Sequence, residues 1–136
     1  GRKEYLKPNI IEAMDTLERE TENNDGLVVN FCLSYGGRAE IIDATKTIVK
    51  KVQNNEISFD DINENVFNKN LYHNLPDVDF LIRTSGEQRI SNFMLWQISY
   101  AELYFPKVYF PDFDPDELEK AFQEYESRDR RFGKVK

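Results

Sequence analysis

The chain has 136 residues, which suits one domain, and 40% of them are hydrophobic, enough for a core. The formal net charge of −7 disfavours nucleic acid as the main partner, because phosphate backbones normally meet a basic face. One cysteine and one histidine exclude an internal disulfide and argue against a structural zinc site. No apolar segment is long enough to span a bilayer and no signal peptide is present, so we expect a cytoplasmic protein.

The first half of the chain predicts a helix, a strand and a second helix. Apolar residues recur at helical spacing over 8–22, and the nearly continuous apolar run 27–33 is typical of a parallel strand buried on both faces. Within that run Cys32 is expected to be buried, and Asn30 needs a hydrogen-bond partner as a core or site residue. Gly36-Gly37 then indicates a tight turn needing positive φ, ahead of a helix that ends near Val52.

The second half predicts further alternating elements. These are a short helix over 61–69, a strand over 78–82, a helix over 92–98 with Ser91 as its N-cap, a strand region over 103–110 broken by Pro106, and a final helix from 114. Asp114, Pro115 and Glu117 fit the N-cap, first and third positions of that last helix. The alternation predicts an α/β fold with a partial parallel sheet flanked by helices, in a single domain over 1–136.

Two arginines and a serine surround the loop after the strand over 78–82. Arg83 stands at the strand end, and Arg89, Ile90 and Ser91 follow the polar loop that contains Gly86. Ligands of open α/β sheets bind outside the carboxyl ends of strands, and a following helix N-terminus favours anions. Because arginine's planar fork suits phosphate oxygens, this pattern predicts a phosphate or diphosphate site. The alternative is that both arginines only pair with neighbouring carboxylates, and spacing alone leaves the two hypotheses about even. Those carboxylates are Asp77, Asp79 and Glu87.

Three motifs of the chain are specific. The longest comprises Arg83-Thr84-Ser85-Gly86-Glu87, Arg89, Ser91-Asn92-Phe93, Leu95-Trp96-Gln97 and Tyr100-Ala101-Glu102-Leu103-Tyr104-Phe105. The others are Asn30 with Tyr35-Gly36-Gly37-Arg38, and Arg130-Arg131-Phe132-Gly133. On these motifs the chain resembles the cis-prenyltransferases, the family of undecaprenyl diphosphate synthase. The resemblance covers only the C-terminal portion of the family, and the family's Asp-Gly-Asn-Gly-Arg-Trp motif is not in the chain.

The resemblance implies a transferase that condenses isopentenyl diphosphate onto an allylic diphosphate such as farnesyl diphosphate, with Mg²⁺. The expected product is a cis-polyprenyl diphosphate, the undecaprenyl lipid carrier of cell-wall synthesis. By resemblance, Arg83, Arg89, Ile90 and Ser91 bind isopentenyl diphosphate, and Glu102 is linked to Mg²⁺. Asp79 and Glu87 would orient the arginines, whereas Gln88 stands where some relatives carry histidine.

The resemblance also implies a homodimer, in which Arg131 and Gly133 reach the neighbouring subunit's site. The resemblance places no catalytic residue in this portion, so we expect the chain alone to be inactive. It also implies that the enzyme lies peripherally at the inner face of the membrane and delivers its product there. Two other classes stay open: a non-catalytic accessory subunit of a heteromeric cis-prenyltransferase, and an unrelated phosphate-binding regulator. Joint retention of Arg83, Arg89, Ser91 and Glu102 favours the enzyme.

Overall fold

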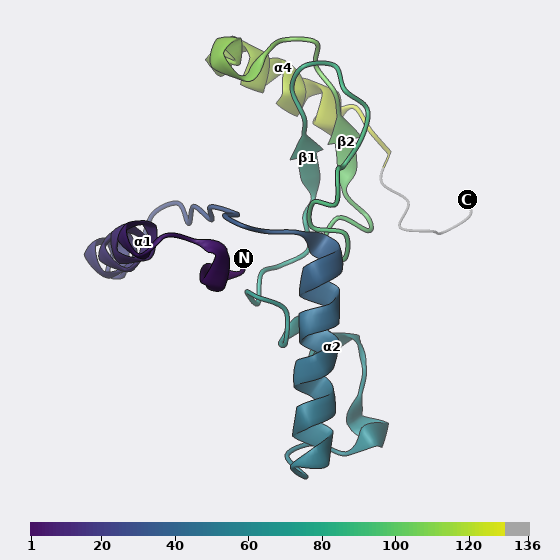
Figure 1. Cartoon of the computed structure of the whole chain (residues 1–136). Coiled ribbons are helices and arrows are strands. Elements are labelled where there is room, and N and C mark those ends of the chain that lie inside the picture. Colours follow the sequence, from purple (N-terminus) through teal and green to yellow (C-terminus); the bar gives the residue numbers. More distant parts are fainter. Residues whose placement is uncertain (130–136) are drawn as a thin grey trace. The chain divides into compact units, whose positions relative to one another are not determined.

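A computed structural model describes residues 1–129 (Figure 1). The chain divides into two compact units. The first unit is Gly1–Tyr72, and the second begins at His73. The chain contains α-helices and a small parallel sheet, so the predicted α/β class is confirmed. None of the helices among residues 1–129 is long and apolar enough to cross a membrane.

The first unit contains three α-helices, α1 (Pro8–Thr21), α2 (Gly37–Gln53) and α3 (Glu64–Asn68), with the 3-10 turns η1 (Lys3–Tyr5) and η2 (Phe59–Asp61). Pro8 occupies the first position of α1, where its missing N–H costs no hydrogen bond. Helix α2 buries Glu40, Ala44 and Ile48, which recur every four residues along one face. The helix ends at Gln53, one residue beyond the predicted end near Val52.

Polar contacts hold the ends of the first unit to α2. The Arg2 guanidinium donates two hydrogen bonds to the Asp43 carboxylate at 2.8 and 2.9 Å, and the Tyr72 hydroxyl donates a third at 2.6 Å. The Arg2 hydrogen bond lowers the pKa of Asp43 to about 2. Glu40, almost fully buried, accepts hydrogen bonds from the Tyr35 hydroxyl and the Tyr72 amide.

The predicted strand over 27–33 does not form. Residues 27–33 are irregular, Leu27 and Val28 are 91% and 79% exposed, and Cys32 is exposed rather than buried. A buried parallel strand needs a neighbour on its edge to take its main-chain hydrogen bonds, and no described residue pairs with this run. The apolar pattern of residues 27–33 therefore indicated strand propensity, but a strand does not form without a neighbouring strand to pair with.

The glycine pair does not use positive φ. Gly36 is extended, with φ −160° and ψ 127°, and Gly37 is the buried first residue of α2. A residue with a side chain could adopt either conformation, so the prediction of a turn needing positive φ was wrong.

The second unit is built on two parallel strands, β1 (Phe80–Ile82) and β2 (Glu102–Tyr104), in which Phe80 pairs with Glu102 and Ile82 with Tyr104. The 3-10 turn η3 (Phe110–Asp112) and helix α4 (Pro115–Glu126) follow. The ring of Phe80 lies 6.2 Å from Tyr104 and 5.0 Å from Tyr125 of α4, so α4 packs on the sheet face that carries these rings (Figure 1). The Asp114 carboxylate caps α4 as predicted, accepting from the Glu117 amide at 2.9 Å.

Two predicted elements of the second unit are absent. Residues 91–100 form successive turns instead of a helix over 92–98, and residues 108–110 are not a strand. Ser91, Asn92 and Met94 have φ of 46°, 63° and 44°, which a right-handed helix cannot contain. Ser91 therefore caps no helix, and the expected helix dipole behind the loop does not exist in this structure.

Candidate functional site

The loop after β1 is held by main-chain hydrogen bonds to the segment after β2. The Arg83 amide donates to the Tyr104 carbonyl at 2.9 Å, and the Ser85 and Gly86 amides donate to the carbonyls of Val108 and Pro106, both at 2.7 Å. Ser85 and Gly86 both have positive φ, 72° and 70°. The loop is thus fixed at both ends of its turn, which gives Arg83 a defined position.

Arg83 brings the predicted site residues together. Its side chain is half-buried, and Nη1 donates to the Arg89 carbonyl at 2.6 Å and to Ser91 Oγ at 2.9 Å. Ile90, between these two acceptors, is half-buried and its carbonyl accepts from the Phe93 amide. No described carboxylate pairs with Arg83, so the other guanidinium nitrogens keep their capacity to donate to an anion.

Arg89 instead follows the alternative hypothesis: it pairs with the Glu87 carboxylate. The two side chains are 58% and 48% exposed, and an ion pair so open to water contributes little to stability. A diphosphate, with more negative charge and more acceptor oxygens, can therefore replace Glu87 at low cost.

Asp79 is exposed, and its carbonyl accepts a hydrogen bond from the Glu102 amide. This places Asp79 beside the start of β2 through its main chain. Its role in orienting an arginine stays a prediction.

Glu102 lies apart from the three phosphate-binding candidates. It opens β2 opposite Phe80, whereas Arg83 follows the far end of β1, roughly 10 Å further along the strands at about 3.3 Å per residue. Paired residues of parallel strands point to the same face, so Glu102 lies on the α4 face of the sheet, with Phe80 and Tyr104. The described unit therefore does not place Glu102 against Arg83.

A partner of Glu102 was missed in the sequence. Arg128, just after α4, donates from Nη1 to Glu102 Oε2 at 3.0 Å and to the Leu103 carbonyl at 2.9 Å. Its Nη2 donates to Glu124 Oε1 at 3.1 Å. The hydrogen bond to Glu102 raises the pKa of Arg128 above its usual value. The sequence signal was only a basic residue just after the last helix, which gave no hint of a strand partner.

The donor chemistry at Glu102 fits a hard divalent cation in part. A carboxylate oxygen suits Mg²⁺, which in phosphate-transfer sites takes one or two carboxylates, substrate phosphates and water. Residues 1–129 contain no cluster of three His, Cys, Asp or Glu side chains that could hold a metal by itself. Arg131 and Gly133, expected to act across a dimer, lie outside the described residues.

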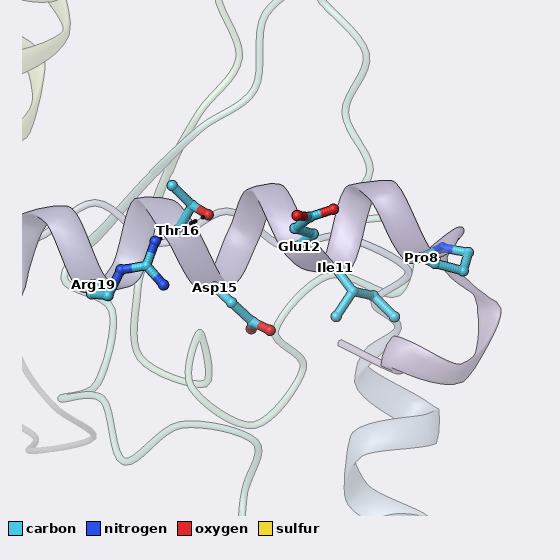
Figure 2. Close-up of a pocket in the computed structure, with 6 residues that line it drawn as sticks. All are labelled: Pro8, Ile11, Glu12, Asp15, Thr16 and Arg19. Atoms are coloured by element: carbon cyan, nitrogen blue, oxygen red, sulfur yellow. Dashed lines mark hydrogen bonds between the residues drawn. The ribbon is translucent and has the colours of Figure 1, made fainter.

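A shallow depression in the first unit runs along the flank of α1 (Figure 2). It is lined by Pro8, Ile11, Glu12, Asp15, Thr16 and Arg19. Two carboxylates on one open helix flank repel an anionic ligand, so this surface does not suit a diphosphate.

The comparisons with known proteins agree with this architecture. A family model described as "Putative undecaprenyl diphosphate synthase" matches residues 1–133. An isoprenyl transferase of Fusobacterium nucleatum is 48% identical over 100% of this chain and 56% of its own length. A tritrans,polycis-undecaprenyl-diphosphate synthase (geranylgeranyl-diphosphate specific) of Pyrococcus furiosus is 47% identical over 98% of this chain and 51% of its own length.

Among solved structures, lavandulyl diphosphate synthase from Lavandula x intermedia, in complex with dimethylallyl diphosphate, matches with a TM-score of 0.94 and 37% identity. The match covers 98% of this chain and 58% of that one. The chain spans about half the length of the curated relatives it matches. On the family match and these similarities together, the chain belongs to the prenyltransferase family of undecaprenyl diphosphate synthase.

Proposed function

We propose that the protein is a cis-prenyltransferase that condenses isopentenyl diphosphate onto an allylic diphosphate such as farnesyl diphosphate, and that this chain carries the isopentenyl diphosphate site. The single observation that supports it most is the Arg83 side chain, which joins the Arg89 main chain to the Ser91 hydroxyl at the end of a parallel strand. A forked cation fixed there by neutral acceptors keeps its full charge for an incoming anion.

In the proposed site, Arg83 and Arg89 hold the diphosphate by charge-assisted hydrogen bonds. Ser91 keeps Arg83 in position, and its hydroxyl can also donate to a phosphate oxygen. Glu87 pairs with Nη1 of Arg89, so the remaining N–H groups of that guanidinium can donate to the diphosphate. Fixing the acceptor in one orientation supplies the part of the rate enhancement that comes from proximity, on the order of 7–11 kcal/mol when both reactants are held.

Mg²⁺ is part of the proposal, with Glu102 as one oxygen ligand and phosphates supplying others. When bound, the ion would neutralise diphosphate charge. The undecaprenyl product, its use in cell-wall synthesis, the homodimer and peripheral delivery at the membrane are proposed on the same family membership.

Incorporation of radiolabelled isopentenyl diphosphate into product tests this proposal. The full-length gene product, incubated with farnesyl diphosphate and Mg²⁺, should incorporate label into butanol-extractable polyprenyl diphosphate, and the product length can be read by chromatography after dephosphorylation. Absence of labelled product with every allylic diphosphate tried would contradict the proposal that the protein is a cis-prenyltransferase. Product formed only after addition of a second, different family subunit would favour the accessory-subunit alternative.

A further inference from the structure

The proposed reaction gives no role to the ion pair that Arg128 forms with Glu102. Both side chains are 27% exposed, so the pair is shielded from water more than the Arg89–Glu87 pair. Arg128 is also fixed by the Leu103 carbonyl and by Glu124, so its position does not depend on Glu102 alone. Its charge is permanent at any physiological pH.

The contact uses one carboxylate oxygen. Arg128 Nη1 reaches Oε2, and no described residue donates to Oε1. A divalent cation at Oε1 would therefore lie within a few ångströms of a guanidinium that stays in place. Like charges at that distance repel, and the partial burial of the pair reduces the screening by water.

We propose that Arg128 is a positioning residue that holds Glu102 in one orientation and weakens its affinity for a divalent cation, so that the cation binds there together with a diphosphate rather than alone. This inference rests on the proposed role of Glu102. In this arrangement, free Mg²⁺ meets a carboxylate whose charge Arg128 already neutralises. A cation–diphosphate complex instead brings negative charge that offsets the repulsion between the cation and Arg128. Arg128, just after α4, thereby sets the affinity of Glu102 in β2 for the cation.

Glu124 tunes the same contact in the opposite direction. It shares the Arg128 guanidinium with Glu102, accepting from Nη2 at 3.1 Å on the exposed side of α4. Removing its charge should leave Arg128 more fully to Glu102 and weaken cation binding further. Glu126, an exposed acid in the last turn of the same helix, provides a matched charge control.

The experiment is Mn²⁺ binding to the full-length gene product, measured from the free-Mn²⁺ paramagnetic resonance signal with and without isopentenyl diphosphate. Arg128→Gln should tighten Mn²⁺ binding about thirtyfold, the effect of one charge near 4 Å from a divalent ion in a water-like dielectric. Arg128→Lys should stay within about twofold of wild type because the charge remains. Glu124→Gln should weaken binding about twofold relative to Glu126→Gln, by loss of a competing partner.

The variants separate this inference from the function beneath it. Glu102→Gln should weaken Mn²⁺ binding and abolish the effect of Arg128→Gln in the double variant. If Glu102→Gln weakens binding but Arg128→Gln leaves it unchanged or weaker, the inference is overturned and the role of Glu102 stands. If Glu102→Gln has no effect, the assignment of Glu102 fails and the inference with it. Thermal melts check folding, and Glu124→Gln, on the exposed side of α4, decides the matter if Arg128→Gln does not fold.

Discussion

At the scale of single residues, the site depends on how Arg83 is held. Ser91 Oγ accepts from Arg83 Nη1, so Ser91→Ala removes one of two acceptors that fix the guanidinium. We expect the Michaelis constant for isopentenyl diphosphate to rise about fivefold, the value of one hydrogen bond of about 1 kcal/mol. Ser127→Ala, at the exposed end of α4, should leave it unchanged. Equal Michaelis constants in both variants would remove Ser91 from the site.

Residue patterns predicted part of this arrangement. The order Arg83, Arg89, Ser91 indicated that these groups gather after one strand. The structure places the Arg83 guanidinium against the Ser91 hydroxyl and the Arg89 main-chain carbonyl, whereas the Arg89 guanidinium pairs with Glu87. The Arg128–Glu102 pair could not be predicted, because its partners are 26 residues apart and meet only when α4 packs on the sheet. Local spacing carries no information about such a contact.

At the scale of elements, the cap of α4 supports the sheet face that carries Glu102. Asp114→Ala removes the acceptor of the Glu117 amide and should lower the free energy of unfolding by about 1 kcal/mol, the usual cost of an N-cap loss. Asp116→Ala, in the first turn but not the cap, serves as the control. Chemical denaturation measures both, and equal losses would show that the cap adds nothing.

The contact between η1, α2 and Tyr72 should make the first unit sensitive to acid. Arg2 lowers the pKa of Asp43 from its ordinary value near 4 to about 2. A lowered carboxyl pKa stabilises the fold above its unfolded pKa, so this contribution is complete above about pH 4 and lost as pH falls towards 2. The stability difference between wild type and Asp43→Asn, followed by urea unfolding, should shrink over that window. A difference independent of pH would refute the linkage.

The sequence predicted most helices and the strand at β1 correctly, but not the fate of two segments, 27–33 and 92–98. Caps and apolar spacing located α1, α2 and α4 within a residue or two. The run over 27–33 has strand-forming residues but no partner among the described residues, and 92–98 has helical residues but left-handed φ at three nearby positions. Tertiary context decided both cases.

At the scale of the whole molecule, exposed rings around η3 indicate an association surface. Tyr109 and Phe110 are 67% and 80% exposed. If the full-length gene product is the proposed homodimer, Phe110→Ser should raise its dissociation constant by roughly tenfold or more, since burying one such ring stabilises by about 1.5–3 kcal/mol. Phe59→Ser, equally exposed in η2, is the control. Sedimentation equilibrium decides, and a wild-type monomer at micromolar concentration would end the proposal.

The central claim is that Arg83 and Arg89 form the isopentenyl diphosphate site, and calorimetric titration with that ligand tests it most directly. Arg83→Ala and Arg89→Ala should each weaken binding roughly ten- to hundredfold, because a hydrogen bond to a charged group contributes about 1.5–3 kcal/mol. Arg19→Ala, an exposed arginine of α1, should bind as wild type does. Unchanged dissociation constants in both site variants, with normal melting temperatures, would contradict the account.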